Sequence, residues 1–143
     1  MTRTIYVLNG PNLNLLGTRE PEIYGRETLA DIEATLTREG AALGLDIEFR
    51  QTNHEGVLVD WLHEAARDGA AVLLNAGAYT HTSIALLDAI RAIAVPVIEV
   101  HLSDPTQREP FRHISYVGMA ATDTVQGLGA RSYSVALQRA ARL

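Results

Sequence analysis

A glutamate and a histidine, Glu99 and His101, lie two residues apart in the segment VPVIEVHLSD, which has the composition of a β-strand. The two-residue period of a strand places both side chains on one face. A carboxylate beside an imidazole fixes the tautomer and supports the cation, which suits a general acid or base. A central parallel strand is normally apolar on both faces, so a functional role is favoured over a buried pair that only satisfies itself. A metal site with His81 as a further ligand ranks last, because the spacing matches no metal motif.

A tyrosine and an arginine, Tyr24 and Arg19, lie in the long segment NGPNLNLLGTREPEIYGRE, which also contains Asn12. A connection of this length after a strand is typical of an active-site lid. A phenol ionises only near pH 10, but a guanidinium about 4 Å away stabilises the phenolate by about 4 kcal/mol at an effective dielectric constant of about 20. Arg19 beside Tyr24 would therefore give a tyrosinate base. The alternative is that Tyr24 only packs the lid and Arg19 pairs with Glu20 or Glu22.

The segment NAGAYTHTSIALLDAI connects another expected strand to a helix. Asn75 offers a ligand both a carbonyl and an amide, Gly77 permits a tight turn, and His81 lies just before the helix. Within the helix, Asp88 lies on or beside the apolar stripe. Two interpretations stay open: a surface pair with Arg91, or an acidic side chain that projects into a neighbouring subunit.

Two arginines, Arg108 and Arg112, lie four residues apart in SDPTQREPFRH. They follow the backbone amides of Leu102 and Ser103, which could form an anion-binding nest. Arginine binds carboxylates through two parallel hydrogen bonds. Because this segment follows the same strand as His101, a carboxylate or a hydroxyl-rich anionic ligand is favoured over ordinary surface salt bridges.

Together these residues suit the removal of a proton next to a carbonyl group and the loss of a hydroxyl as water through an enolate. The chain has no cysteine and no lysine, and all 12 basic residues are arginines. Thiol nucleophiles, disulfides, thiolate metal sites and a side-chain Schiff base are therefore excluded. No cofactor and no metal are expected.

The composition is typical of a folded enzyme or binding module. The chain has 143 residues, of which 47% are hydrophobic and 20% charged, and its net charge is -5. One domain covering residues 1–143 is expected, without disorder and without a nucleic-acid partner. The N-terminus shows no signal peptide and no long apolar segment, so we expect a cytoplasmic protein without membrane contact.

Short β-branched runs alternate with amphipathic stretches, a pattern typical of a doubly wound parallel sheet. The expected strands are Thr4–Leu8, Leu45–Thr52, Ala71–Leu74, Val95–Val100 and Ser115–Ala121, and the expected helices run from about Thr28 to before Gly44, from Val57 to Arg67, from Ser83 to Ala92 and onward from after Gly129. Ligands of such sheets bind beyond the carboxyl ends of the strands. The residues singled out above follow the first, third and fourth strands, as this geometry requires.

The sequence closely resembles the type II 3-dehydroquinate dehydratases, the cofactor-free class of the shikimate and quinate pathways. The motifs NGPNLNLLGTREPEIYG, TNHEG, NAGAYTHTSIALLDAI and EVHLSDPTQREPFRH stand in the order and spacing of that family and cover nearly the whole chain. The expected fold is α/β: a flavodoxin-like, doubly wound five-stranded parallel sheet in a three-layer α/β/α sandwich. The resemblance implies the reversible elimination of water from 3-dehydroquinate to give 3-dehydroshikimate.

The resemblance also implies a catalytic role for residues of the first and fourth connections. Tyr24 would take a proton from the carbon beside the ketone, and Arg19 would favour its ionised form. Asn12 would hold a water molecule that stabilises the enolate. His101 would protonate the departing hydroxyl, with Glu99 orienting it.

A second group of residues would bind the substrate and connect subunits. Its members at the hydroxyls and the carboxylate are Asn75, His81, Ser103, Arg112, the amides of Leu102 and Ser103, and Arg108 from the lid side. Asp88 would reach in from an adjacent subunit of a trimer, and the family commonly assembles four trimers into a dodecamer.

Three departures from the family pattern are visible, and none removes a catalytic group. They are Asp104 where Asn is common, Ala76 where Pro is common and Ser132 where Gly is usual. The alternative from another class is a non-catalytic flavodoxin-like module that binds a small ligand, such as a flavin carrier or a receiver domain. A receiver would need acidic residues after the first and third strands and a lysine, whereas this chain has Asn9 and Asn75 there.

Overall fold

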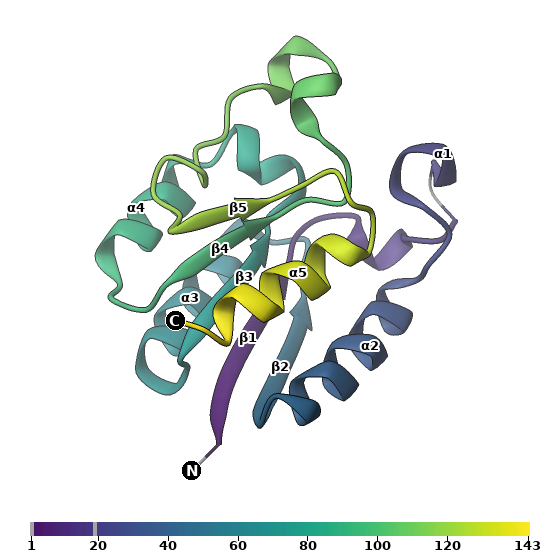
Figure 1. Ribbon diagram of the computed structural model, residues 1–143. Coiled ribbons are helices and arrows are strands. Elements are labelled where there is room, and N and C mark those ends of the chain that lie inside the picture. Colours follow the sequence, from purple (N-terminus) through teal and green to yellow (C-terminus); the bar gives the residue numbers. More distant parts are fainter. Residues whose placement is uncertain (1, 19) are drawn as a thin grey trace.

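The centre of the protein is a parallel sheet of five strands in the order β2-β1-β3-β4-β5 (Figure 1). The computed structural model describes residues 2–18 and 20–143. The strands are β1 (Arg3–Asn9), β2 (Leu45–Gln51), β3 (Ala71–Asn75), β4 (Val97–Val100) and β5 (Asp123–Val125). The direction of winding reverses between β1 and β3, which is the point at which open α/β sheets bind their ligands.

Helices cover both faces of the sheet, which confirms the expected three-layer α/β/α fold (Figure 1). The α-helices are α1 (Pro21–Tyr24), α2 (Leu29–Ala42), α3 (Glu55–Asp68), α4 (Ile84–Ala92) and α5 (Arg131–Ala140). Short 3-10 turns are η1 (Leu13–Leu15), η2 (Gly77–His81), η3 (Pro105–Gln107) and η4 (Pro110–Arg112). Among the described residues, no helix is long and apolar enough to cross a membrane.

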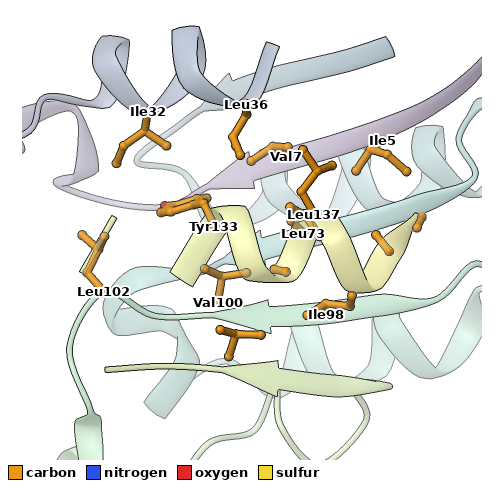
Figure 2. Packing of buried hydrophobic residues seen from close by; sticks show 14 of the residues in the cluster. Ile5, Val7, Ile32, Leu36, Leu73, Ile98, Val100, Leu102, Tyr133 and Leu137 are labelled. Atoms are coloured by element: carbon orange, nitrogen blue, oxygen red, sulfur yellow. The ribbon is translucent and has the colours of Figure 1, made fainter. Parts of the chain in front are cut away.

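Alternating side chains of the strands build two separate cores. Ile5 and Val7 of β1 point to α2 and α5, in the core that Figure 2 shows, whereas Tyr6 and Leu8 point to α3 and α4. Tyr133 of α5 lies inside the first core. In the central strand β4, the one ionisable side chain is that of Glu99, next to the carboxyl end of the strand.

The start of α2 shows how local sequence sets an element boundary. The Thr28 hydroxyl accepts a hydrogen bond from the Asp31 amide at 3.1 Å, and the Asp31 carboxylate accepts one from the Thr28 amide at 3.0 Å. These two reciprocal hydrogen bonds form a capping box, which fixes the first turn of the helix. The two hydrogen bonds lower the pKa of Asp31 below its ordinary value.

The expected fifth strand at Ser115–Ala121 is wrong, because this segment forms turns and β5 follows it at Asp123–Val125. The backbone amide of Gly118 donates to the Ser115 hydroxyl, and the amide of Ala121 donates to the Val117 carbonyl. Val117 is fully buried in the core under α3 and α4. Its apolar side chain serves that core rather than a strand.

The connections after β1 and β3 touch at Gly10. A Cβ atom there would lie 2.7 Å from the Ala76 carbonyl carbon and closer still to its oxygen, so alanine displaces backbone. We expect Gly10→Ala to lower the free energy of unfolding by about 1–3 kcal/mol, measured by urea denaturation. Gly56→Ala is the matched control, because a Cβ meets nothing within 4 Å there and alanine favours the helix. Equal stability of the two variants would contradict the close approach.

Candidate active site

One cleft opens at the carboxyl ends of β1, β3 and β4, beside the switch point of the sheet. Its lining includes nine of the side chains or backbone positions expected from the sequence: Asn12, Tyr24, Asn75, His81, His101, Leu102, Ser103, Arg108 and Arg112. Glu99 lies behind His101, and Asp88 lies elsewhere on the surface of α4. Arg19 lies outside the described residues.

The carboxylate of Glu99 is buried at the end of β4 and accepts three hydrogen bonds. His101 Nε2 donates to Oε2 at 2.6 Å, the Ser115 hydroxyl to Oε2 at 2.5 Å and the Thr124 hydroxyl to Oε1 at 2.8 Å. The donors come from the residue after β4, from the turn segment before β5 and from β5 itself. Both oxygens of the Glu99 carboxylate therefore accept hydrogen bonds, and partners from three segments compensate its buried charge.

Burial opposes ionisation of Glu99, but its partners outweigh this cost. Burial alone raises the pKa, whereas the hydrogen bond and charge of His101 and the two hydroxyl donors lower it, and the net result lies below the ordinary value of 4.5. Glu99 is thus a carboxylate at neutral pH. Because Glu99 holds Nε2 of His101, Nδ1 is the ring nitrogen left for a ligand.

His81 lies beside His101 with the opposite tautomer fixed. Its Nδ1 donates to the Ile114 carbonyl at 2.7 Å, which leaves Nε2 as an acceptor in the neutral ring. Burial lowers the pKa of His81, and the neighbouring His101 and Arg112 lower it further, against the opposing effect of the Ile114 carbonyl. The two rings are stacked with centroids 6.5 Å apart. His81 therefore offers the cleft a neutral imidazole.

Tyr24 ends the short helix α1 and both lines the cleft and packs against the core under α2 and α5. The guanidinium carbon of Arg108 lies 5.1 Å from the centre of its ring. A guanidinium at this distance from an aromatic ring makes a cation–π contact with it. Packing of the lid and a position in the cleft are thus compatible for Tyr24.

Positive charge dominates the cleft although the chain is acidic. Arg108 and Arg112 line it, and the described residues contribute no carboxylate to its wall. Glu109 lies outside, 2.9 Å from Arg112 and 3.9 Å from Arg108. Hydrogen bonds between described residues leave the amides of Leu102 and Ser103 without an acceptor. The wall is suited to a carboxylate ligand.

Asn12 is held in an unusual backbone conformation at the mouth of the cleft. Its φ angle is 69°, in the left-handed region that asparagine tolerates better than most residues. The Asn12 amide donates to the Asn53 side chain at 3.0 Å. This bond fixes the first turn of the long connection after β1.

Several residues that shape the site were missed by sequence reasoning. Ser115 and Thr124 orient Glu99, Asn53 anchors Asn12, and Tyr133 contacts Asn75. The pairing of Glu99 with Thr124 across β4 and β5 would have been a signal if β5 had been located correctly. No local pattern points to Tyr133, which is 58 residues from Asn75.

The structure bears on two sequence-based expectations, the role of Asp88 and a metal site. Asp88 is exposed on α4 and forms no ion pair with Arg91 within the described part of the chain. Over residues 2–18 and 20–143, no three His, Asp or Glu side chains are grouped so as to hold a metal ion. His81 and His101 each commit one ring nitrogen to a protein oxygen.

Comparisons with known proteins agree with the fold. A family model described as dehydroquinase class II matches residues 3–141. A 3-dehydroquinate dehydratase of Hyphomonas neptunium is 60% identical over 143 residues, covering 100% of this chain and 96% of that protein. The crystal structure of a type II dehydroquinase from Propionibacterium acnes is 46% identical, with a TM-score of 0.95 over 100% of this chain and 99% of that one.

The chain belongs to the class II dehydroquinase family. It is an enzyme of the hydro-lyase type, and this membership favours the catalytic interpretation over a non-catalytic ligand-binding module. A second solved relative, a type II dehydroquinase from Butyrivibrio crossotus, is 36% identical over 97% of both chains with a TM-score of 0.95.

The lowered pKa of Glu99 gives a pH dependence with a defined sign. Folding favours its ionised form, so this contribution is complete above about pH 4.5 and is lost as pH falls through the lower pKa of the folded state. We expect Glu99→Gln to lower the free energy of unfolding by about 1–3 kcal/mol at pH 7, because a buried donor replaces an acceptor. The deficit relative to wild type should shrink toward pH 3.

Urea denaturation of both proteins between pH 7 and pH 3 measures this effect. Glu33→Gln is the control, because Glu33 is exposed on α2. A deficit of Glu99→Gln that stays constant over this range would contradict a carboxylate stabilised by folding.

Proposed function

We propose that the cleft eliminates water from 3-dehydroquinate with Tyr24 as the base and His101 as the acid. One observation carries this proposal: the phenol of Tyr24 and the imidazole of His101 line the same cleft. Arg108 lies over the Tyr24 ring, and Glu99 is hydrogen-bonded to His101. A base and an acid in a cleft that attracts carboxylates suit an elimination next to a ketone.

In the first step, Tyr24 as a phenolate removes a proton from the carbon beside the ketone. Arg108 supports the phenolate from above its ring, and we assign Arg19 a second supporting charge. Electrons of the broken C–H bond form an enolate, whose oxygen is stabilised by a water molecule on Asn12. Donors that meet charge only as it develops lower the barrier selectively.

In the second step, the enolate reforms the ketone, a carbon–carbon double bond forms and the C–O bond to the hydroxyl breaks. His101 gives its proton from Nδ1 to the departing oxygen, which leaves as water. Glu99 stabilises the imidazolium before this transfer through the bond at Nε2. Proton exchange with solvent then returns Tyr24 and His101 to their starting states.

The remaining wall residues hold the substrate in register. We assign its carboxylate to Arg112, the Ser103 hydroxyl and the amides of Leu102 and Ser103, which the lack of an acidic wall residue among those described supports. Its hydroxyls are assigned to Asn75 and to the neutral ring of His81. Fixed donors of this kind contribute by positioning the reacting carbon.

We also propose that residues 1–143 act as one catalytic domain in the cytoplasm, assembled as trimers and then as a dodecamer, without nucleic acid. Asp88 would enter the cleft of a neighbouring subunit, and its exposure on α4 supports this role. Ile84, Phe111 and Ile114 are 56%, 65% and 53% exposed, and contact between copies of the chain would remove such apolar side chains from water.

An ultraviolet assay tests the reaction and the order of its steps. Mixing the EDTA-treated protein with 3-dehydroquinate should raise the absorbance at the band of a conjugated enone acid. No rise with folded protein would exclude 3-dehydroquinate as the substrate. In deuterated water, Tyr24→Phe should remove nearly all turnover and nearly all deuterium uptake beside the ketone, with an affinity for the substrate within about tenfold of wild type. His101→Ala should lose at least about 100-fold in turnover but still exchange deuterium. Exchange by Tyr24→Phe would exclude Tyr24 as the base.

Asp88→Ala tests the contribution of a neighbouring subunit. We expect weaker substrate binding or a smaller particle in sedimentation velocity, since a charge at the boundary of two copies is lost. Arg91→Ala, on the same helix, is the control for a surface effect. An unchanged KM together with an unchanged particle size would leave Asp88 as an ordinary surface residue.

A further inference from the structure

A continuous series of four hydrogen bonds runs beneath the cleft from η2 to β2. The Gly77 amide donates to Asn75 Oδ1 at 3.2 Å, and Asn75 Nδ2 donates to the Tyr133 hydroxyl at 2.9 Å. Tyr133 donates to Asn9 Oδ1 at 2.6 Å, and Asn9 Nδ2 donates to the Arg50 carbonyl at 2.9 Å. The series joins the ends of β1 and β3, on either side of the switch point, to α5.

Both ends of this series allow only one direction. The Gly77 amide can only donate, and the Arg50 carbonyl can only accept. Asn9 must therefore turn its oxygen to Tyr133, whose hydroxyl hydrogen is then committed and whose oxygen is left to accept from Asn75. Bonds that all point the same way also polarise one another. The orientation of the Asn75 amide is thus determined from two sides.

Tyr133 is the central member and has no access to solvent that could replace its bonds. Its side chain is 1% exposed, and Asn9 and Asn75 are 0% and 4% exposed. Burial raises the pKa of Tyr133 far above its ordinary value, against the small opposing effect of the Asn75 bond. The hydroxyl therefore keeps its proton and cannot serve as a base.

We propose that Tyr133 is a positioning residue that holds the Asn75 amide with an N–H donor toward the cleft. Asn75 retains one N–H and one lone pair of Oδ1 after its two protein bonds. A donor at this place selects a substrate oxygen that accepts, such as a hydroxyl. Without the Tyr133 hydroxyl the Asn75 amide is held only from the Gly77 side and turns over more readily, and the buried Asn9 oxygen loses its donor. The inference rests on the proposed role of Asn75 in binding substrate.

Steady-state kinetics of Tyr133→Phe test this role, because phenylalanine keeps the ring in the core and removes only the hydroxyl. We expect KM for 3-dehydroquinate to rise about 3- to 10-fold with kcat within about twofold. Loss of folded protein alone would lower the apparent kcat and leave KM unchanged. Tyr6→Phe is the matched control, because it also removes a buried hydroxyl that donates a hydrogen bond. Tyr6 is 5% exposed and donates to Glu64 over 2.9 Å, and neither residue lines the cleft.

A double-mutant cycle with Asn75→Ala separates the two proposals. Tyr133→Phe should add nothing to the KM of Asn75→Ala if it acts through that residue, and independent effects would overturn the assignment. An unchanged KM in Tyr133→Phe with a raised KM in Asn75→Ala would contradict the positioning role of Tyr133 and support substrate binding by Asn75. An unchanged KM in Asn75→Ala would contradict both the role of Asn75 in substrate binding and the positioning role of Tyr133.

Asn9→Ala provides a second test that leaves Tyr133 intact. It removes the acceptor that directs the Tyr133 hydroxyl, so that this hydroxyl is free to donate toward Asn75. We expect a KM raised in the same direction as in Tyr133→Phe. A wild-type KM in folded Asn9→Ala would contradict a directed series of hydrogen bonds.

Discussion

A parallel sheet covered by helices on both faces has no room for unpaired polar groups except at the ends of its strands. Ile5, Val7, Leu73 and Ile98 fill one face, and the alternate positions fill the other with equally apolar side chains. Polar chemistry is therefore displaced to the carboxyl ends, where the chain leaves the sheet. The cleft lies where the carboxyl ends of β1, β3 and β4 bring such polar residues together.

Two separate hydrogen-bond systems hold the floor of the cleft. Glu99 joins β4, the turn before β5 and β5 itself, and it fixes the ring of His101. Tyr133 joins α5 to the ends of β1 and β3 and fixes Asn75. Neither system shares a residue with the other, so the ring of His101 and the amide of Asn75 are oriented independently. Such anchoring keeps reacting groups in place without cost during the reaction.

The fold class and the membership of the cleft were predictable because they depend on local pattern. Alternation of apolar residues located four of the five strands, and the order of strand ends in an α/β sheet then brought distant motifs together. Strand β5 was missed because Asp123 and Thr124 are polar in a strand of only three residues, while the preceding apolar segment is a turn.

Supporting contacts within the site could not be predicted in the same way. Tyr133 looks like any aromatic residue on the buried face of a helix, and its hydroxyl meets Asn9 across 124 residues of sequence. Ser115 approaches Glu99 only because a turn replaces the expected strand. Contacts of this kind follow from the packed tertiary structure, for which sequence periodicity contains no information.

The guanidinium carbon of Arg50 lies over two aromatic rings, 5.3 Å from the centre of the Tyr6 ring and 5.4 Å from that of the Trp61 ring. Trp61 is the single tryptophan of the chain. Intrinsic indole fluorescence thus comes from one place, the junction of α3 with β1 and β2. A change in emission during denaturation therefore records the separation of that helix from the sheet.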